Sequence, residues 1–401
     1  MKFAITGIGI ANGLGDSLEE NWANLLAGKT AIREISWPED NPRKFPKTHK
    51  ALTVKTGAPC PLPSFHEDEY NGEWQNWDPC VQLAVYAAKS ALEDSKVSSK
   101  NISVIYSTTG GNLHSRSYIS RHLEDGRERI LPRQVIQATI DYVSGVVSRL
   151  FELNGISTAM HTACATGLVS LDYGLKILET EDDIDAVLVG GVDTPIEAFQ
   201  TYYFQNLGAL GNEAKPFDKN REGFVAGEGA GALVIEPLEK AQARGAKIYA
   251  VICSIGTASY GSHETAPDTN GISCKAAINK ALKKAGVLGN KIGLVNAHAT
   301  GTVAGDDIEY NAVKELLPNA VMTANKGQIG HTLAASGIIE TIYTIQSLRY
   351  QMCPPTVNLT DPVGTDIQIP TIATPINTNY AIKNNFAFSG RSACAVIERY
   401  L

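Results

Sequence analysis

The chain has 401 residues, 43% of them hydrophobic, and a formal net charge of −7. This length can bury a large core and indicates two or more domains, and the acidic balance argues against a generally basic surface for nucleic acid. The apolar runs are far shorter than the roughly 20 residues that a membrane-spanning helix needs, so we expect no membrane insertion.

Cysteine usage bears on the compartment and on metal binding. Seven cysteines are present, an odd number with no C-x-x-C pair and no dense spacing pattern. Such usage is typical of buried thiols in a reducing compartment, so we expect a cytoplasmic protein. His161 and Cys164 are near each other, but no second pair at ligand spacing accompanies them, so we expect no metal site.

Predicted strands and helices alternate along the first part of the chain. An apolar strand over 2–9 ends in glycine, a helical pattern covers 80–92, and a second apolar strand covers 102–110. Residues 154–160 are bounded by turn residues and indicate a short buried strand. A helix is predicted next, because leucines recur at helical spacing at Leu168, Leu171, Leu175 and Leu178.

The second part of the chain repeats this pattern. The strand predicted at 248–256 resembles the first strand of the chain, and 292–301 resembles 102–110. The strand, loop and helix around Cys164 resemble the segment that contains His331. Because strands alternate with helices, we expect mainly parallel sheets covered by helices.

The join between the two halves is predicted at a helix over 239–244 that a glycine closes. We therefore expect two duplicated halves, residues 1–245 and 246–401. Related halves place their strand ends opposite each other, so Cys164 and His331 should meet at the centre.

Cys164 lies in the segment T-A-C-A-T-G, between an extended stretch and a helical pattern. At the start of a helix, the dipole and the free N–H groups favour a thiolate. A lone cysteine is more often a structural core residue. Two later segments favour a catalytic role, because His298 and His331 each follow a short apolar strand and could serve as imidazole partners of a nucleophile.

The segments T-A-C-A-T-G, N-x-H-A-T-G-T-x-x-G-D and K-x-x-x-G-H-T resemble the three active-site blocks of the β-ketoacyl-ACP synthases. This family is the ketosynthase branch of the thiolase superfamily, and the resemblance covers essentially the whole chain. It implies a thiolase-like α/β fold with α-β-α-β-α layers. It also implies a decarboxylative Claisen condensation, in which Cys164 takes an acyl group and His298 and His331 stabilise the enolate of a malonyl thioester.

The resemblance implies supporting roles for further residues. The oxyanion donors would be the N–H groups of Cys164 and Phe388, and Phe388 would also gate the acyl pocket. Lys326 would anchor a buried polar network with Asp306 and Glu340, for which solvated charges on helix faces are the alternative. The remaining candidates are in contact with substrate: Thr300 and Thr302 with the phosphopantetheine arm, or else in a simple turn, and Thr109 and Phe204 with the acyl chain.

Some residues depart from the family pattern. The segment N-N-F-A-F-S-G-R-S stands where ketosynthases of this group usually carry N-S-F-G-F-G-G-T-N, so Ala387 and Ser389 replace glycines and should stiffen the gate. Arg391 adds a charge beside the gate. Thr109 is smaller and more polar than usual. Within fatty-acid or type II polyketide biosynthesis, this favours a substrate other than the saturated chains of fatty-acid synthesis, such as a polyketide or a polyene. His161 has no evident role.

The expected partner is an acyl carrier protein, whose phosphopantetheine holds the substrates, and no cofactor is expected to bind permanently. We expect a homodimer, or a heterodimer with a related ketosynthase or chain-length-factor subunit. Docking of an acidic carrier requires a local basic patch, with Arg127, Arg129 and Arg133 as candidates.

Two other functions compete with the ketosynthase hypothesis. A non-catalytic chain-length factor would need none of Cys164, His298 and His331. A nucleotide-dependent oxidoreductase built on the glycines at 7–13 would leave both histidine segments unexplained, and their spacing departs from G-x-G-x-x-G.

Overall fold

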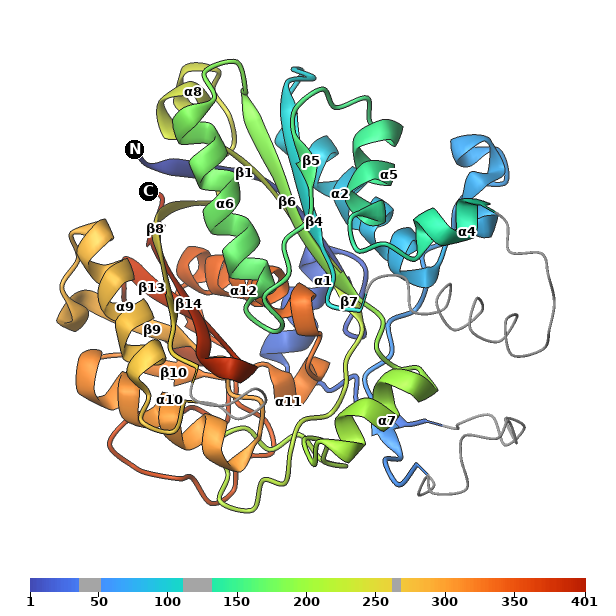
Figure 1. Cartoon of the computed structure of the whole chain (residues 1–401). Coiled ribbons are helices and arrows are strands. Elements are labelled where there is room, and N and C mark those ends of the chain that lie inside the picture. Colours follow the sequence, from blue (N-terminus) through green and yellow to red (C-terminus); the bar gives the residue numbers. More distant parts are fainter. Residues whose placement is uncertain (36–51, 111–131, 262–267) are drawn as a thin grey trace.

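The computed structural model describes residues 1–35, 52–110, 132–261 and 268–401 (Figure 1). Its main element is a ten-stranded sheet in the order β10-β9-β13-β14-β8-β1-β7-β6-β4-β5. The strands of the first half are β1 Phe3–Asn12, β4 Ile102–Ser107, β5 Ser157–Thr158, β6 Ala186–Asp193 and β7 Gly229–Pro237. Those of the second half are β8 Ala250–Ser259, β9 Ile292–Asn296, β10 Val321–Thr323, β13 Tyr380–Ala387 and β14 Arg391–Arg399.

The strand order shows the predicted duplication. Read outward from the centre, β1-β7-β6-β4-β5 mirrors β8-β14-β13-β9-β10, and the two inner strands β1 and β8 pair only at Phe3, Ala4 and Ile5. The outer strands of each half are parallel, as expected, in the pairs β6–β4, β4–β5, β13–β9 and β9–β10. The inner pairs are antiparallel.

A hairpin explains part of this difference from a mainly parallel sheet. Strands β13 and β14 are joined by one short turn, Phe388–Gly390, and a turn of that length can connect only antiparallel strands. The sequence pattern showed alternating strands and helices but not which strands lacked an intervening helix.

Helices form three layers around the two halves of the sheet. The middle layer holds α6 Thr166–Thr180 and α12 Ser336–Tyr350, which contact strands of both halves (Figure 1). Helix α2 Pro79–Ser95 and α5 Tyr142–Leu150 cover the first half, and α9 Ile272–Ala285 and α10 Val303–Leu316 lie on the second. This confirms the expected α-β-α-β-α layering. The other α-helices in the described part of the chain are α1 Leu18–Leu26, α4 Pro132–Gln137, α7 Ala198–Asn206, α8 Leu238–Ala243 and α11 Lys326–Ile329.

The two central helices approach each other very closely. A Cβ atom added to Gly167 on α6 would lie 2.8 Å from the Cα atom of Gly337 on α12, a distance that real side chains do not allow. Helix α12 is buried over Ser336–Leu348, which suits a helix enclosed between two sheets. Because the active-site segments lie just before these helices, this contact sets how close Cys164 and His331 can come.

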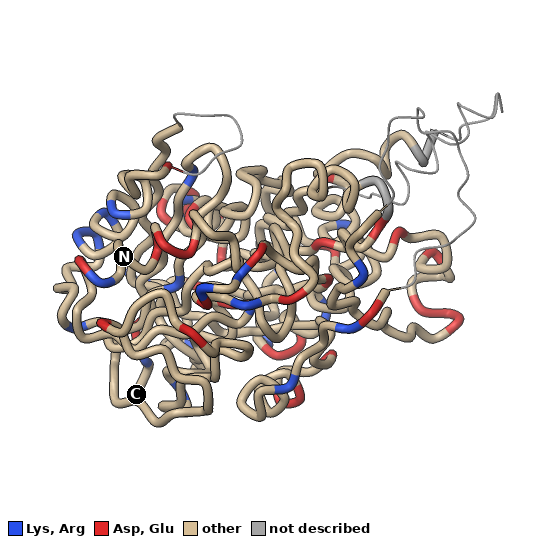
Figure 2. The backbone as a smooth tube through the Cα atoms, turned by 90° about the horizontal axis from the view of Figure 1, so that it is seen from below, with Lys and Arg blue, Asp and Glu red and all other residues tan. Residues whose placement is uncertain are grey.

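In the described part of the chain, none of the helices has the length and apolar character needed to cross a bilayer. Lys and Arg are interspersed with Asp and Glu along the described backbone (Figure 2).

Candidate active site

Cys164 lies in a tight turn directly before α6. Ala163 adopts a φ of 52°, in the left-handed region, so the chain reverses sharply at this point. The Thr166 hydroxyl accepts a hydrogen bond from the Thr162 N–H (2.9 Å) and donates one to the Ala163 carbonyl (2.6 Å). These bonds hold the turn, and the Cys164 side chain lines a cavity of about 330 Å³.

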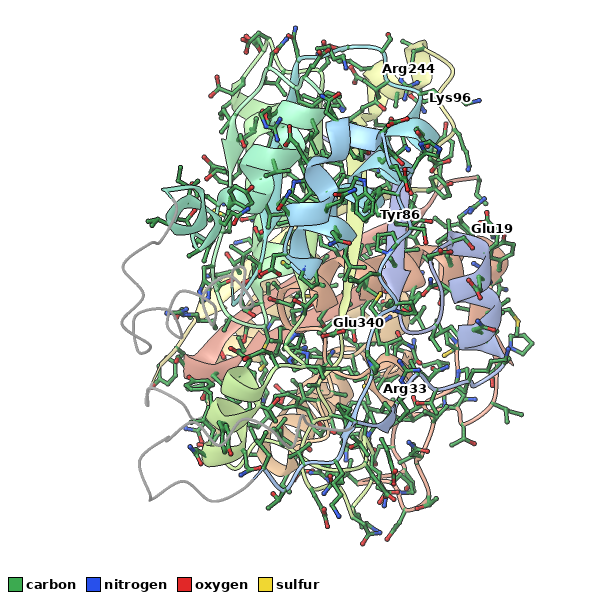
Figure 3. The ribbon with its side chains drawn as sticks, turned by 90° about the vertical axis from the view of Figure 1, so that its right-hand side faces the viewer. Glu19, Arg33, Tyr86, Lys96, Arg244 and Glu340 are labelled. Carbon is green, nitrogen blue, oxygen red and sulfur yellow. The ribbon has the colours of Figure 1, made fainter. Side chains whose placement is uncertain are left out.

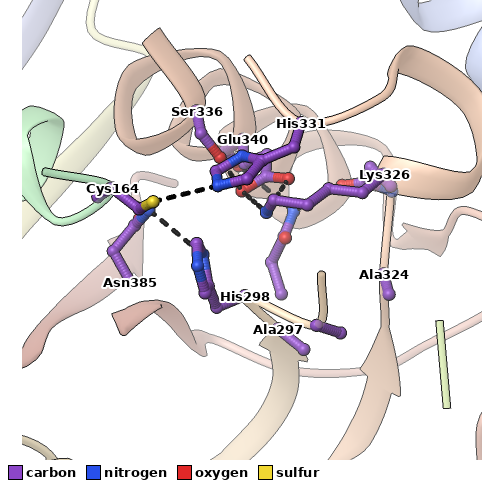
Figure 4. A network of polar contacts seen from close by, with 12 residues as sticks. Cys164, Ala297, His298, Ala324, Lys326, His331, Ser336, Glu340 and Asn385 are labelled. Atoms are coloured by element: carbon purple, nitrogen blue, oxygen red, sulfur yellow. Dashed lines mark hydrogen bonds and ion pairs between the residues drawn. The ribbon is translucent and has the colours of Figure 1, made fainter. Parts of the chain in front are cut away.

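His331 follows α11 in the second half of the chain. Its Nε2 atom lies 3.1 Å from the Cys164 Sγ atom (Figure 4). Its Nδ1 atom lies 3.3 Å from the Leu333 N–H, which donates to it. Because Nδ1 accepts a hydrogen bond, the proton of the neutral ring belongs on Nε2, which then faces the cavity as a donor.

His298 follows β9 and lies next to His331. The two imidazole ring centroids are 5.3 Å apart. The side-chain Nδ2 atom of Asn385 lies 3.4 Å from His298 Nδ1 and 3.0 Å from the Cys164 carbonyl oxygen, so this one amide contacts both segments (Figure 4). A donor at Nδ1 again favours the tautomer with its proton on Nε2.

The backbone at His298 is held by Glu309 of α10. The carboxylate of Glu309 accepts hydrogen bonds from the His298 N–H (2.9 Å) and the Ala299 N–H (2.7 Å). Ala299 has a φ of 24°, an unusual value for alanine. Glu309 therefore stabilises a strained turn that the imidazole depends on.

Both imidazoles are kept neutral by their surroundings. Burial, followed by the charge of Lys326, holds the pKa of His298 and of His331 well below the usual histidine range. A neutral imidazole donates one hydrogen bond from Nε2 without itself carrying charge. The pair can therefore stabilise an oxyanion that develops between them.

Two effects act in opposite directions on the thiol of Cys164. Burial raises its pKa to about 12, and the charge of Lys326 only partly opposes this. The position before a helix favours the thiolate. Burial therefore favours the neutral thiol, and the thiolate in the resting enzyme stays a prediction.

A buried ion-pair network lies behind the imidazoles. Lys326 Nζ lies 2.7 Å and 2.9 Å from the two carboxylate oxygens of Glu340, and Glu340 is fully buried (Figure 4). Figure 3 places Glu340 in the interior, whereas Glu19 and Lys96 lie at the periphery. The alternative of solvated charges is therefore excluded for Glu340. The second cation in contact with this carboxylate is Lys383, at 2.8 Å.

Asp306 is not part of this network, so that prediction is wrong. Its carboxylate accepts hydrogen bonds from the N–H groups of Phe217 (2.8 Å) and Gly301 (3.0 Å), and among the described residues its ion-pair partner is Arg221, at 3.9 Å. Burial raises the pKa of Asp306 to about 7. Asp306 thus stabilises the turn after His298 rather than the lysine that precedes His331.

The cavity brings together most of the predicted substrate-binding residues. It is lined by Cys164, His298, His331, Phe388, Phe204, Thr300 and Thr302, among others. The hydroxyl oxygens of the two threonines are 3.0 Å apart, so both the turn role and the arm-binding role remain compatible with the geometry. Phe388 and Cys164 lie on the same cavity, as the shared oxyanion role requires.

Thr109 does not line this cavity. Its hydroxyl donates to the buried carboxylate of Asp193 at 2.9 Å, and its carbonyl oxygen lies 3.0 Å from His161 Nε2. Asp193 also accepts from the Ala334 N–H at 2.7 Å, close to His331. The polar Thr109 is explained by this carboxylate, so it gives no support for a specialised acyl chain.

One further prediction, the basic patch for the carrier protein, concerns three arginines with limited or no description. Arg127 and Arg129 lie outside the described residues, and Arg133 falls within α4 but its side chain is not described. The proposed basic patch therefore stays a prediction.

The ligand atoms of Cys164, His298 and His331 lie within 4.8 Å of one another, which is a spacing that zinc could use. The ammonium groups of Lys326 and Lys383 act on both imidazoles, so they oppose a cation at this place. This electrostatic arrangement suits a developing anion better.

Sequence reasoning missed three residues that contact the site: Glu309, Lys383 and Asn385. The last two were visible as polar side chains in the strand Tyr380–Ala387, which is mostly apolar outside Lys383–Asn385 and where an unpaired lysine would be costly. Their partners could not be identified, because these lie on other strands and helices.

Comparison with known proteins agrees with this geometry. Sequence models of the β-ketoacyl synthase N-terminal and C-terminal domains match residues 2–241 and 249–360. This chain belongs to the β-ketoacyl synthase family. A relative named 3-oxoacyl-[acyl-carrier-protein] synthase 2 from Vibrio cholerae is 32% identical, covering 99% of each chain. The protein of the same name from Rhizobium meliloti is 33% identical, covering 100% of this chain and 99% of its own.

Solved ketosynthase structures superimpose over the whole chain. A β-ketoacyl synthase from Burkholderia phymatum has a TM-score of 0.91 at 28% identity and covers all of both chains. The ishigamide ketosynthase/chain length factor has a TM-score of 0.87 at 28% identity, covering 100% of this chain and 99% of that one. These comparisons confirm the fold and the ketosynthase assignment, and they place this chain among acyl-transferring enzymes.

Proposed function

We propose that this synthase condenses an acyl group held on Cys164 with a malonyl group held on an acyl carrier protein. The observation that carries the proposal is the placement of His331 Nε2, 3.1 Å from the Cys164 Sγ, with Nδ1 engaged by the Leu333 N–H. A proton-bearing Nε2 beside the acylated sulfur lies where an oxyanion would develop.

The first half-reaction loads the enzyme. Cys164 Sγ attacks the carbonyl carbon of an acyl-carrier thioester, and the carbon–sulfur bond to the carrier breaks. The proton of the Cys164 thiol leaves with the released phosphopantetheine thiol. The N–H groups of Cys164 and Phe388 stabilise the tetrahedral oxyanion.

The second half-reaction forms the carbon–carbon bond. The malonyl carboxylate leaves as carbon dioxide, and the electrons of the broken bond pass to an enolate. The enolate oxygen accepts hydrogen bonds from His298 and His331. The enolate carbon then attacks the acyl carbonyl on Cys164, the bond from that carbonyl carbon to Sγ breaks, and the leaving thiolate takes up one proton from the solvent.

The carrier protein is the proposed partner, and its phosphopantetheine arm would be in contact with Thr300 and Thr302 on the cavity wall. Support comes from relatives named for acyl-carrier-protein substrates. We propose no permanently bound cofactor. The cytoplasmic location and the division at residue 245 stay predictions.

A partner role in a heterodimer is the second candidate. It is favoured by the similarity to the ishigamide ketosynthase/chain length factor. The presence of Cys164, His298 and His331 around one cavity argues that this chain is the catalytic subunit of such a pair, or one half of a homodimer.

One experiment tests the function. Purified protein is mixed with an acyl-carrier thioester and malonyl-carrier, and the carrier products are weighed by intact-mass spectrometry. A carrier bearing the 3-oxoacyl chain, formed by the wild type and not by Cys164→Ala, is expected. Absence of that product with every acyl group and every carrier tried would contradict the proposal. A preference for saturated, unsaturated or keto-bearing acyl groups would separate fatty-acid from polyketide substrates.

A further inference from the structure

Lys383 is a fully buried lysine in the middle of β13. Its neighbours in this strand are apolar or uncharged, so a hydrophobic residue would be expected here from packing alone. A buried ammonium group persists only when it is paired. The contacts of its Nζ atom therefore indicate what the residue does.

The Nζ atom contacts four oxygens from three segments. It lies 2.8 Å from Glu340 Oε2 on α12, 2.6 Å from the Asn384 carbonyl oxygen, 3.1 Å from that of Ala297 and 3.4 Å from that of Asn296. Strand β9 ends at Asn296, where it pairs in parallel with Lys383. Lys383 thus extends the attachment of β9 by one residue, to the peptide group that precedes His298.

Lys383 also completes an unusual charge arrangement. Glu340 is paired with two ammonium groups, because Lys326 contacts it from α11 and Lys383 from β13. The other charged or titratable groups that Lys383 faces are Glu309 on α10, Cys394 on β14 and the two imidazoles. Burial lowers the pKa of Lys383 to about 8, so its ammonium form prevails at neutral pH.

The second ammonium group acts on the imidazoles. Its charge, in addition to burial and the charge of Lys326, lowers the pKa of both His298 and His331. One lysine would be sufficient to neutralise Glu340. The charge of the second lysine adds to that of Lys326 at both imidazoles, which disfavours an imidazolium.

We propose that Lys383 is a positioning residue that fixes the peptide group before His298 and, together with Lys326 across Glu340, keeps both imidazoles as neutral hydrogen-bond donors. The catalytic importance of neutral donors rests on the proposed function. The effect of Lys383 on the ionisation of the two histidines does not rest on it. The ionisation state of two histidines can be measured without substrate.

The test is the NMR titration of histidines in isotope-labelled protein. Ring ¹⁵N shifts distinguish a neutral ring protonated at Nε2 from a charged ring, and the signals are assigned with His298→Ala and His331→Ala. In the wild type, both rings should stay neutral with the proton on Nε2 when the pH falls through the usual histidine midpoint of about 6.5. A wild-type ring that is charged at pH 6 would overturn the proposal.

Two variants separate charge from hydrogen bonding. Lys383→Met removes both, and Lys383→Gln removes the charge while keeping a donor for the Ala297 carbonyl. In each, the titration midpoints of His298 and His331 should rise by about one pH unit. The matched control is Lys280→Met, because Lys280 is exposed on α9 and its Nζ atom donates to the Thr257 carbonyl, away from Glu340 and the imidazoles. In Lys280→Met, the titration midpoints of His298 and His331 should equal those of the wild type.

The activity profile gives a second readout. With less opposing charge, each imidazole becomes protonated at a higher pH. The acid limb of malonyl-carrier decarboxylation should therefore move upward by the same amount as the NMR midpoints. Unchanged midpoints in folded Lys383→Gln would refute the inference. A wild type with neutral rings but no decarboxylation would instead refute the proposed function and leave the inference standing.

Discussion

The Nε2 atom of His331 lies 3.1 Å from the Sγ atom of Cys164, although 167 residues separate the two along the chain. Each residue lies just before one of the two central helices, α6 and α12, which pack closely where Gly167 faces Gly337. The duplicated fold therefore produces the active-site contact directly. One half contributes the nucleophile, and the other contributes the imidazoles.

The first prediction concerns the resting state of the nucleophile. Because burial raises the pKa of Cys164 to about 12, the thiolate fraction is small and rises with pH. The rate of alkylation by iodoacetamide should increase about tenfold per pH unit between about pH 6 and pH 9. A thiolate ion pair would instead give a rate that is independent of pH in this range.

Peptide mapping identifies which thiol reacts. Cys274 lines the same cavity, so it is the internal comparison for access. Cys164 should be labelled first, because it alone has an imidazole in contact with its sulfur among the described residues. Faster labelling of Cys274 would count against the assignment of the nucleophile.

The second prediction separates the two half-reactions. His298→Ala and His331→Ala each remove one donor to the enolate oxygen, an effect worth roughly 3–4 kcal/mol in comparable sites. Carbon dioxide release from malonyl-carrier should fall by about 10²–10³-fold. Self-acylation of Cys164 should be partly retained, since the backbone donors remain. Wild-type carbon dioxide release by either variant would show that its role is misassigned.

The third prediction tests Glu309. Its carboxylate accepts hydrogen bonds from two backbone N–H groups, those of His298 and Ala299. Glu309→Gln would place the NH₂ group of the amide against one of these two donors. The free energy of unfolding should decrease by about 1–3 kcal/mol, as expected for an unsatisfied buried group. Glu315→Gln is the control, because Glu315 is exposed on the same helix. Equal denaturant midpoints for both variants would exclude the proposed role.

The fourth prediction concerns the gate, where the structure distinguishes two substitutions that the sequence treated alike. Ser389 adopts a φ of 63°, whereas Ala387 adopts an ordinary φ of −106°. Ser389→Gly should therefore cost no stability, because glycine removes left-handed strain. Ala387→Gly should destabilise by about 0.5–1 kcal/mol. Ser389→Ala keeps the Cβ atom and serves as the control for the lost hydroxyl.

Acyl selectivity of the double variant tests whether the gate is stiffer. Ala387→Gly with Ser389→Gly should change the rates of Cys164 acylation across a series of chain lengths. Decarboxylation by His298 and His331 should stay the same. Superimposable profiles would show that the substitutions in this loop are neutral for substrate choice.

The fifth prediction concerns carrier docking. With a net charge of −7, long-range attraction of an acidic carrier has to come from a local basic patch. Reversing the charge of Arg127, Arg129 and Arg133 should raise KM for carrier-bound substrate in a salt-dependent way. Small thioester mimics should be unaffected. An equal loss with both kinds of substrate would indicate a structural role for these arginines.

The sequence by itself determined the reacting groups. Cys164, His298 and His331 lie in short segments of recognisable sequence, and the nearby Thr166 fixes the turn at Cys164. The repeated strand pattern also predicted two related halves that meet at the centre. These features could be read because each depends on residues close together in the chain.

Only the tertiary structure decided which residues support those groups. Glu340 is paired with Lys383 as well as Lys326, Asp306 bonds the turn after His298, and Thr109 bonds a buried carboxylate instead of lining the cavity. The physical reason is that a buried charge is compensated by whichever partner the packing of distant strands and helices brings within about 3 Å. The spacing of residues along the chain does not determine that distance.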